Sequence, residues 1–207
     1  MVELFTSEGC SSCPPAEGYL GELAQRRDVL ALAYHVDYWD DLGWRDRFGL
    51  QEAVQRQRAY AKALGLSAVF TPQAVVDGQE SLVGGNRSAI ARSLERPRSG
   101  VAVALSARDG EIVVDFEQQA NVAPSDVVLL AYQRTAISHI GRGENAGRTL
   151  EEYNIVRGLR SLGRWTGEKR QYRFPAGSLP QEATDVAIIV QPLGQAPIIG
   201  AAALALR

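Results

Sequence analysis

Residues 2–16 decide the fold, and they read VELFTSEGCSSCPPA. The first four of them form a short, mostly apolar run typical of a buried strand, and a loop follows up to Gly9. Pro14 and Pro15 then open a predicted helix, because the amides of a first helical turn have no partner within the helix and proline has no amide proton to lose. Cys10 and Cys13 therefore lie where a strand leads through a loop into a helix.

Cys10 and Cys13 are the only cysteines among the 207 residues. A disulfide-stabilised scaffold would carry several spaced pairs, so this pair is better suited to chemistry. Thiol–disulfide exchange needs an attacking thiolate and a second thiol that resolves the mixed disulfide. We expect Cys10, partly exposed before the helix, to attack and Cys13 to resolve. The helix dipole should lower the Cys10 pKa below the roughly 8.5 of a free thiol, and the hydroxyls of Ser11 and Ser12 can donate to the thiolate.

Predicted strands and helices alternate through the first half of the chain. The apolar run VLALAYHV at 29–36 suits a strand covered on both faces, and the spacing over 50–64 is that of an amphipathic helix. Asp77-Gly78 is a strong hairpin signal, and Asn86 can cap the helix after it. These signals predict further elements at residues 73–76, 81–83 and 86–96.

The pattern changes after a predicted linker at residues 96–100 (RPRSG). Short strand-like segments then follow with little helix, at residues 101–106, 112–116, 127–133, 153–157, 171–174, 186–190 and 198–206. Short strands separated by turns are typical of an antiparallel sandwich. We therefore predict an α/β domain over residues 1–97 and a mainly antiparallel, sandwich-like β domain over residues 98–207.

The composition argues against several classes of partner. The net charge is −2 and the isoelectric point is near 5.8, so the charge balance does not attract nucleic acid or an anionic membrane. No apolar run approaches the roughly 20 residues needed to span a bilayer. The chain opens directly on a predicted strand, which fits either a cytoplasmic start or a leader that has been removed. We predict no cofactor, no nucleic-acid partner and no membrane span.

Residues 1 to about 96 resemble the thioredoxin-like superfamily. The likeness is closest at 61–80 (AKALGLSAVFTPQAVVDGQE), where Thr71-Pro72 falls at the position of the superfamily's cis-proline. The resemblance implies that Pro72 is cis, lies beside the reactive sulfur and helps to hold substrate. It also implies that Thr71 offers backbone groups to an extended peptide.

The motif at residues 2–16 and HVDYWDDLGW at 35–44 are more narrowly similar to an uncharacterised bacterial family of thioredoxin-like proteins that often carry a secretion signal. The similarity extends to IGRGENAG at 140–147. It implies a periplasmic or secreted location, with the cytoplasm as the alternative. The chain departs from thioredoxin itself in the Gly-Cys-Ser-Ser-Cys-Pro motif, in an insertion at 37–49 and in an attached second domain. These departures put ordinary cytoplasmic reductase activity in doubt.

Metal binding is the main alternative use of the cysteine pair. Two cysteines supply half of a tetrahedral site for zinc or copper, and His35 or His139 would have to complete it. His35 lies within an apolar run, so we favour a core histidine with satisfied hydrogen bonds. His139 precedes a glycine-rich segment and is expected to be exposed. We therefore assign no metal ligand.

Two further segments stand out. Residues 37–49 follow the second strand at the edge where ligands gather in open α/β sheets, so Trp39 could line the site or grip a peptide. Packing of Trp39 and Trp44 onto the core is the favoured alternative. Residues 141–148 (GRGENAGR) lack the ending of a phosphate-binding loop, so we expect a flexible hairpin loop there.

Together these features predict a thiol–disulfide oxidoreductase that acts on a protein or a low-molecular-weight thiol or disulfide through Cys10 and Cys13. A metal carrier and a non-catalytic interaction module with the same fold are the alternatives. The expected substrate-binding residues are Ser11, Ser12, Trp39, Thr71 and Pro72.

Overall fold

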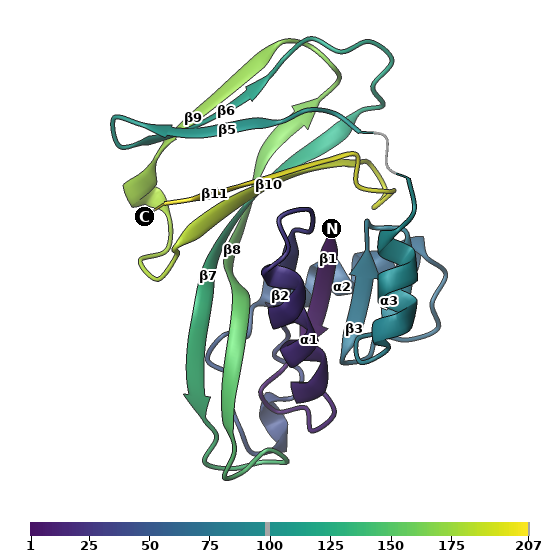
Figure 1. Ribbon diagram of the computed structural model, residues 1–207, viewed down its shortest axis with the longest axis vertical. Helices are drawn as coiled ribbons and strands as arrows, with labels where there is room; N and C mark the ends of the chain where they lie inside the picture. The colour runs from purple at the N-terminus through teal and green to yellow at the C-terminus, as the bar shows by residue number, and fades with distance from the viewer. Residues whose placement is uncertain (98–99, 207) are drawn as a thin grey trace.

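The computed structural model of the protein describes residues 1–97 and 100–206, so part of the predicted linker, residues 98–99, lies outside the described residues. The N-terminal elements are β1 (Val2–Thr6), α1 (Pro14–Ala24), β2 (Ala31–His35), the 3₁₀ helix η1 (Asp40–Leu42), α2 (Gln51–Ala63), β3 (Gln73–Val76), β4 (Glu80–Val83) and α3 (Arg87–Leu94). The C-terminal elements are β5 (Ala104–Arg108), β6 (Glu111–Phe116), β7 (Ser125–His139), β8 (Thr149–Trp165), β9 (Arg170–Pro175), the 3₁₀ helix η2 (Ala176–Ser178), β10 (Asp185–Pro192) and β11 (Gly200–Ala205). Within these ranges the fold is mixed α/β and consists mostly of sheet (Figure 1).

Local signals in the sequence place several of these elements correctly. Pro14 is the first residue of α1, and the Asn86 side chain caps α3 by accepting a hydrogen bond from the Ala89 N–H at 3.2 Å. Asp77 and Gly78 have φ values of 49° and 69°, as a tight turn between the antiparallel strands β3 and β4 requires. These predictions are confirmed because caps and tight turns depend on neighbouring residues alone.

β7 and β8 are much longer than the strands predicted at 127–133 and 153–157. Polar side chains such as Arg134 and Glu151 occupy the exposed face of the extra residues, so the apolar pattern that marks a strand is interrupted. The β7–β8 hairpin extends beside α1 and β2 to the end of the molecule at which α1 begins (Figure 1). The hairpin therefore reaches the region of the cysteine motif.

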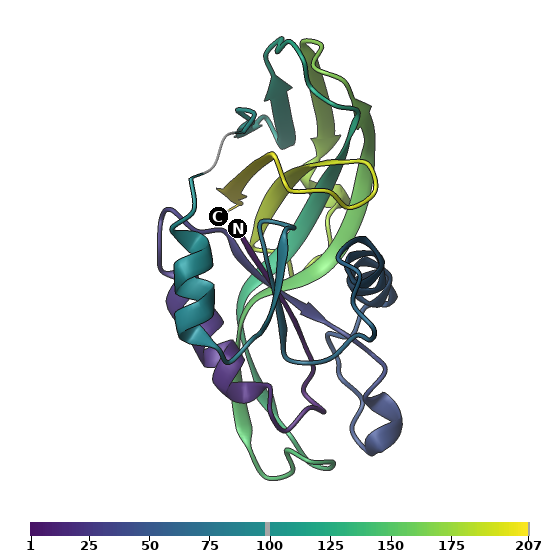
Figure 2. The ribbon, with the colours of Figure 1, turned by 90° about the vertical axis from the view of Figure 1, so that its right-hand side faces the viewer.

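β2, β1, β3 and β4 form one half of an eight-stranded sheet. β1 runs parallel to β2 and antiparallel to β3. Leu20 of α1 and Ile90 of α3 pack in one core cluster with Leu4, whereas Tyr60 of α2 packs against Phe5. Figure 2 shows α1 and α3 on one side of these strands and α2 on the other.

The other half of the sheet contains β11, β10, β7 and β8 in that order. It meets the first half at a single pair, Ala33 of β2 opposite Ile155 of β8. A separate sheet of β5, β6 and β9 packs on this half through an apolar cluster that includes Phe116, Trp165 and Ile188. The apolar layers of this half thus form from residues far apart in the chain.

The two predicted domains share part of their core. One apolar cluster contains Phe5 and Tyr60 from the first 97 residues together with Leu130 and Ile189 from the second half. The boundary between two domains at residues 97 and 98 therefore stays a prediction. In the structure, α2 packs against strands from both sides of that boundary.

A buried ion pair also joins the two halves. Glu3 on β1 is fully buried, and Arg56 on α2 donates to it from Nε at 2.5 Å and from Nη2 at 3.0 Å. The same Nη2 donates to Gln191 Oε1 of β10 at 3.0 Å, and the Tyr60 hydroxyl donates to Glu3. A buried charge pair is tolerated only where further hydrogen bonds support it, and Tyr60 and Gln191 supply them here.

We expect Arg56→Met to lower the free energy of unfolding by about 3–5 kcal/mol, because Glu3 would stay buried without its countercharge. The double variant Glu3→Gln/Arg56→Met removes both charges and should recover most of this loss. Urea denaturation followed by circular dichroism measures both effects. Equal losses in the single and double variants would show that packing, and not charge pairing, dominates at this position.

Candidate functional site

Sheet register brings the cysteine motif and the Thr71–Pro72 peptide to the same edge of the sheet. Gln73 of β3 pairs near the carboxyl end of β1, so the peptide before it lies level with the chain that leaves β1 toward the cysteines. The Thr71–Pro72 peptide is cis, as predicted. A Cβ built on Gly84 would lie 2.9 Å from Pro72 Cβ and 3.1 Å from Ala16 Cβ, so Pro72 lies beside the first turn of α1.

Cys10 and Cys13 form a disulfide, with their Cα atoms 5.4 Å apart. Cys13 is the N-cap residue of α1, and its carbonyl oxygen accepts the N–H group of Glu17. The Ser12 hydroxyl donates to Cys10 Sγ at 3.4 Å, so a predicted hydroxyl does lie beside the sulfur. Ser11 and Ser12 are exposed and form the outer side of the motif.

The disulfide is buried, which corrects the expectation that Cys10 is partly exposed. Cys10 and Cys13 are each only 1% exposed. The sequence pattern placed Cys10 at the surface because loops before helices usually lie there. It gave no indication that another segment covers this loop.

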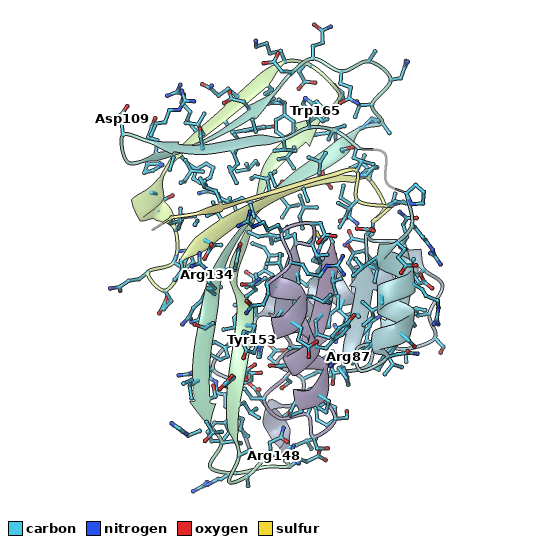
Figure 3. All side chains as sticks on the ribbon, viewed as in Figure 1. Arg87, Asp109, Arg134, Arg148, Tyr153 and Trp165 are labelled. Carbon is cyan, nitrogen blue, oxygen red and sulfur yellow. A yellow bond between two sulfur atoms is a disulfide. The ribbon has the colours of Figure 1, made fainter. Side chains whose placement is uncertain are left out.

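The covering segment is the β7–β8 loop, residues 140–148. The Asn145 amide Nδ2 donates to the carbonyl oxygens of Glu8 and Cys10, both at 2.9 Å, and Asn145 itself is buried. The Glu144 carboxylate accepts the Ser11 N–H at 3.3 Å. Figure 3 shows Arg148 at this end of the hairpin. The predicted hairpin loop is therefore present, and it is hydrogen-bonded to the backbone of the cysteine motif.

The insertion at 37–49 lines another side of the motif. Trp39 Nε1 donates to Thr71 Oγ1 at 2.9 Å, and a Cβ built on Gly9 would lie 3.1 Å from Trp39 Cβ. The indole thus links the loop before Cys10 to the cis peptide. Trp44 Nε1 donates to Glu8 Oε2 at 2.7 Å. Both tryptophans anchor the insertion, and a role of Trp39 in substrate binding stays a prediction.

His35 ends β2 and is fully buried. Its Nδ1 lies 2.8 Å from Asp46 Oδ2, and Asp46 also accepts the N–H groups of Glu8 and Phe48. Burial opposes a positive charge on His35, but neighbouring Asp46 outweighs it and raises the His35 pKa to about 9. The Asp46 pKa is lowered from its usual value. Burial by itself would raise it, but the charge and the hydrogen bond of His35 outweigh burial. We expected a core histidine with satisfied hydrogen bonds. His35 is buried and its Nδ1 is paired, but its Nε2 has no hydrogen-bond partner.

Two more buried carboxyl groups lie next to His35. Glu17 of α1 accepts a hydrogen bond from the Thr6 hydroxyl, and burial raises its pKa to about 7. Glu152 of β8 is fully buried, with Oε2 3.7 Å from His35 Nε2. His139, the other histidine, is instead exposed, with Nδ1 3.0 Å from Thr149 Oγ1.

Sequence reasoning missed Glu17, Asp46, Glu144, Asn145 and Glu152. One signal was available in β8, where Leu150, Glu152, Asn154 and Val156 alternate on the buried face. Polar residues at such apolar positions require partners. Nothing local could have identified Glu144 or Asn145, because their partners are more than a hundred residues away in the chain.

Comparison with known proteins identifies the family but not an activity. The family model described as "Protein of unknown function (DUF1223)" matches residues 1–191, so this chain belongs to that family. The chain is also similar to the crystal structure of protein AGR_C_4864 from Agrobacterium tumefaciens, with 30% sequence identity, coverage of 100% of this chain and 93% of that chain, and a TM-score of 0.87. No curated protein matches. Among the described residues, every helix is too short or too polar to cross a membrane.

We expect Asn145→Ala to make the disulfide easier to reduce, because the variant loses two hydrogen bonds that hold the β7–β8 loop over Cys10. Loss of these bonds is worth about 1–3 kcal/mol, which corresponds to a roughly 5- to 150-fold faster reaction with dithiothreitol if the loop must open first. Timed alkylation of the released thiols, followed by mass spectrometry, measures the rate.

Arg142→Ala is the matched control, because Arg142 is exposed in the same loop. It should leave the rate unchanged. Equal rates for Asn145→Ala and the wild type would mean that reagents reach the disulfide without displacing this loop.

Proposed function

We propose that this member of the DUF1223 family is a thiol–disulfide oxidoreductase that uses Cys10 and Cys13. The observation that carries the proposal is the position of the disulfide, which closes the start of α1 at the sheet edge where the cis Thr71–Pro72 peptide lies. A cysteine pair at a helix start is suited to exchange, because the helix N-terminus favours a thiolate.

The arrangement around the pair supports a thioredoxin-like organisation of residues 1–97. The strands lie in the order β2-β1-β3-β4, with α1 and α3 on one face and α2 on the other. The packing of β5, β6 and β9 on the second half of the large sheet likewise supports a sandwich-like arrangement of residues 98–207. We include both descriptions in the proposal.

The reaction exchanges one disulfide for another. In the oxidised protein, a thiolate of the partner attacks Cys10 Sγ, the Cys10–Cys13 bond breaks, and Cys13 leaves with the electron pair and takes up a proton. A second thiolate of the partner then attacks the partner's sulfur in the mixed disulfide and releases Cys10. The partner is oxidised and the protein is reduced, and the reverse sequence reduces a partner disulfide through attack by Cys10.

Exposed apolar side chains near the motif support a protein substrate. Tyr38 and Leu42 are exposed on the insertion, Phe70 precedes the cis peptide, and Ile137 lies near the tip of β7. The Gln57 side chain bonds both the Tyr38 hydroxyl and the Phe70 carbonyl, and the Arg47 guanidinium donates to the Ile137 carbonyl. Exposed apolar side chains that form a patch mark sites of interaction with other proteins. We propose that Thr71, Pro72 and Trp39 bind an extended segment of the substrate, with Ser11 and Ser12 at the edge of its binding site.

We expect Cys10→Ser to abolish reduction of insulin and oxidation of a dithiol peptide, because no attacking sulfur remains. Cys13→Ser should instead accumulate a mixed disulfide with the partner, seen as added mass that a reductant removes. Ser178→Ala, an exposed position far along the chain, serves as the control and should keep full activity.

Three results would contradict this function. One is equal activity in Cys10→Ser and the wild type. The others are no turnover in either direction, and stoichiometric zinc or copper on the reduced pair without turnover. The last outcome would favour the metal carrier, and inactivity without metal would favour an interaction module.

We further propose a periplasmic or secreted location, with the cytoplasm as the alternative. The similarity of residues 2–16 to a family whose members often carry a secretion signal supports this location. Alkylation of thiols in fractionated cells should find the chain outside the cytoplasm with the pair oxidised. A cytoplasmic chain with both cysteines alkylated would contradict this location.

A further inference from the structure

Three buried side chains from three elements lie close together near the cysteine motif. Glu17 comes from α1, His35 from the end of β2 and Glu152 from β8, and each is buried. One ligand atom of each, a carboxylate oxygen or an imidazole nitrogen, lies within 4.8 Å of the other two. Figure 1 shows α1 and β8 side by side where these elements meet, and Figure 3 shows Tyr153 of β8 directed toward α1.

Two of the three residues, His35 and Glu152, have buried polar atoms without hydrogen-bond partners. His35 Nε2 has none, and neither carboxylate oxygen of Glu152 accepts a hydrogen bond although the residue is fully buried. A buried carboxylate without donors costs several kcal/mol, so natural proteins rarely keep one without a compensating charge. A compensating group is therefore expected at this position.

A proton on His35 Nε2 would compensate the charge only in part. The distance from Nε2 to Glu152 Oε2 is 3.7 Å, which is too long for a hydrogen bond, and Glu152 Oε1 would still have no partner. A metal ion bound to both atoms fits the 3.7 Å distance between His35 Nε2 and Glu152 Oε2 better. Bonds of about 2.0–2.2 Å from imidazole nitrogen and carboxylate oxygen to one ion place neighbouring ligand atoms roughly 3–4 Å apart.

The neighbours of His35 orient its ring so that Nε2 can bind a metal. The Nδ1 side faces Asp46 at 2.8 Å, and Asp46 is held by the N–H groups of Glu8 and Phe48, each at 2.8 Å. A carboxylate that accepts the Nδ1–H of a histidine fixes the tautomer whose Nε2 can bind a metal. This second contact is the usual companion of a metal-binding histidine, and it comes from the insertion at 37–49.

We propose that Glu17, His35 and Glu152 bind a divalent transition-metal ion, for which Zn²⁺ is the probe we select. One imidazole and two carboxylates suit Zn²⁺ or Mn²⁺, whereas the oxygen-only sites of Ca²⁺ and Mg²⁺ lack nitrogen ligands. The site contains no cysteine, so it differs from a carrier site on Cys10 and Cys13.

A cleft opens from solvent toward the site. It has a volume of about 230 Å³ and lies between α1 and β8, and Glu17 forms part of its wall together with Pro14, Gly18, Leu150 and Tyr153. Neither cysteine lines this cleft, so the approach from solvent lies on the side of α1 and β8. Site and route depend on none of the redox chemistry proposed above.

The test uses the full chain with the disulfide intact, so that the cysteines cannot bind metal. After treatment with a chelator and removal of the chelator, isothermal titration calorimetry with Zn²⁺ should show one ion bound per chain, and Zn²⁺ should raise Tm. Glu152→Gln should weaken binding by at least about tenfold, and Asp46→Asn by about 10–100-fold, as for other supporting carboxylates. Glu182→Gln is the matched control, because Glu182 is exposed and lines neither the cleft nor the proposed site.

The proposal is overturned if the folded wild type binds neither Zn²⁺ nor Mn²⁺ in a saturable manner. It is also overturned if Glu182→Gln loses as much affinity as Glu152→Gln, since binding would then be a surface effect. Circular dichroism checks that each variant is folded. If Glu152→Gln does not fold, His35→Gln replaces it in the comparison, and the wild-type titration remains decisive by itself.

Discussion

The need to pair buried ionisable groups at the carboxyl ends of β1 and β2 organises this end of the molecule. His35 cannot be buried there without Asp46, and Glu17 is held by Thr6. These contacts fix the insertion at 37–49 and the start of α1 against the same sheet edge. The cysteine motif therefore lies beside the cis Thr71–Pro72 peptide, and polar groups surround the disulfide.

The C-terminal half of the chain supplies further residues to this end of the molecule. Asn145 and Glu144 cover the motif, and Glu152 enters the polar cluster from the same hairpin. At the other side of the sheet, Arg56 joins Glu3 to Gln191 and so connects α2 to β10. Access to the disulfide is thus a property of how the two halves pack, and reactivity cannot be assigned to the first half in isolation.

Much of the fold and the centre of the site could be predicted from residues close together in the chain. The cysteine motif at a helix start, the cap at Asn86 and the turn at Asp77 follow from short segments, whereas the cis peptide before Pro72 was implied by the family resemblance of residues 61–80. The prediction failed for the exposure of Cys10, and the lengths of β7 and β8 were underestimated. Polar side chains on the outer face of β7 and β8 interrupt the apolar pattern by which strands are predicted. No residue near Cys10 in the sequence indicates that the β7–β8 loop packs on it.

By itself the sequence determined where the chain turns, where helices begin and which two sulfurs can meet, because these depend on backbone dihedral angles and hydrogen bonds between near neighbours. Only the tertiary structure decided that the disulfide is buried and that His35 faces Glu17 and Glu152. Those contacts join residues that lie up to 137 positions apart. Their formation depends on how β8 packs against β2 and α1, and no short window of residues carries that information.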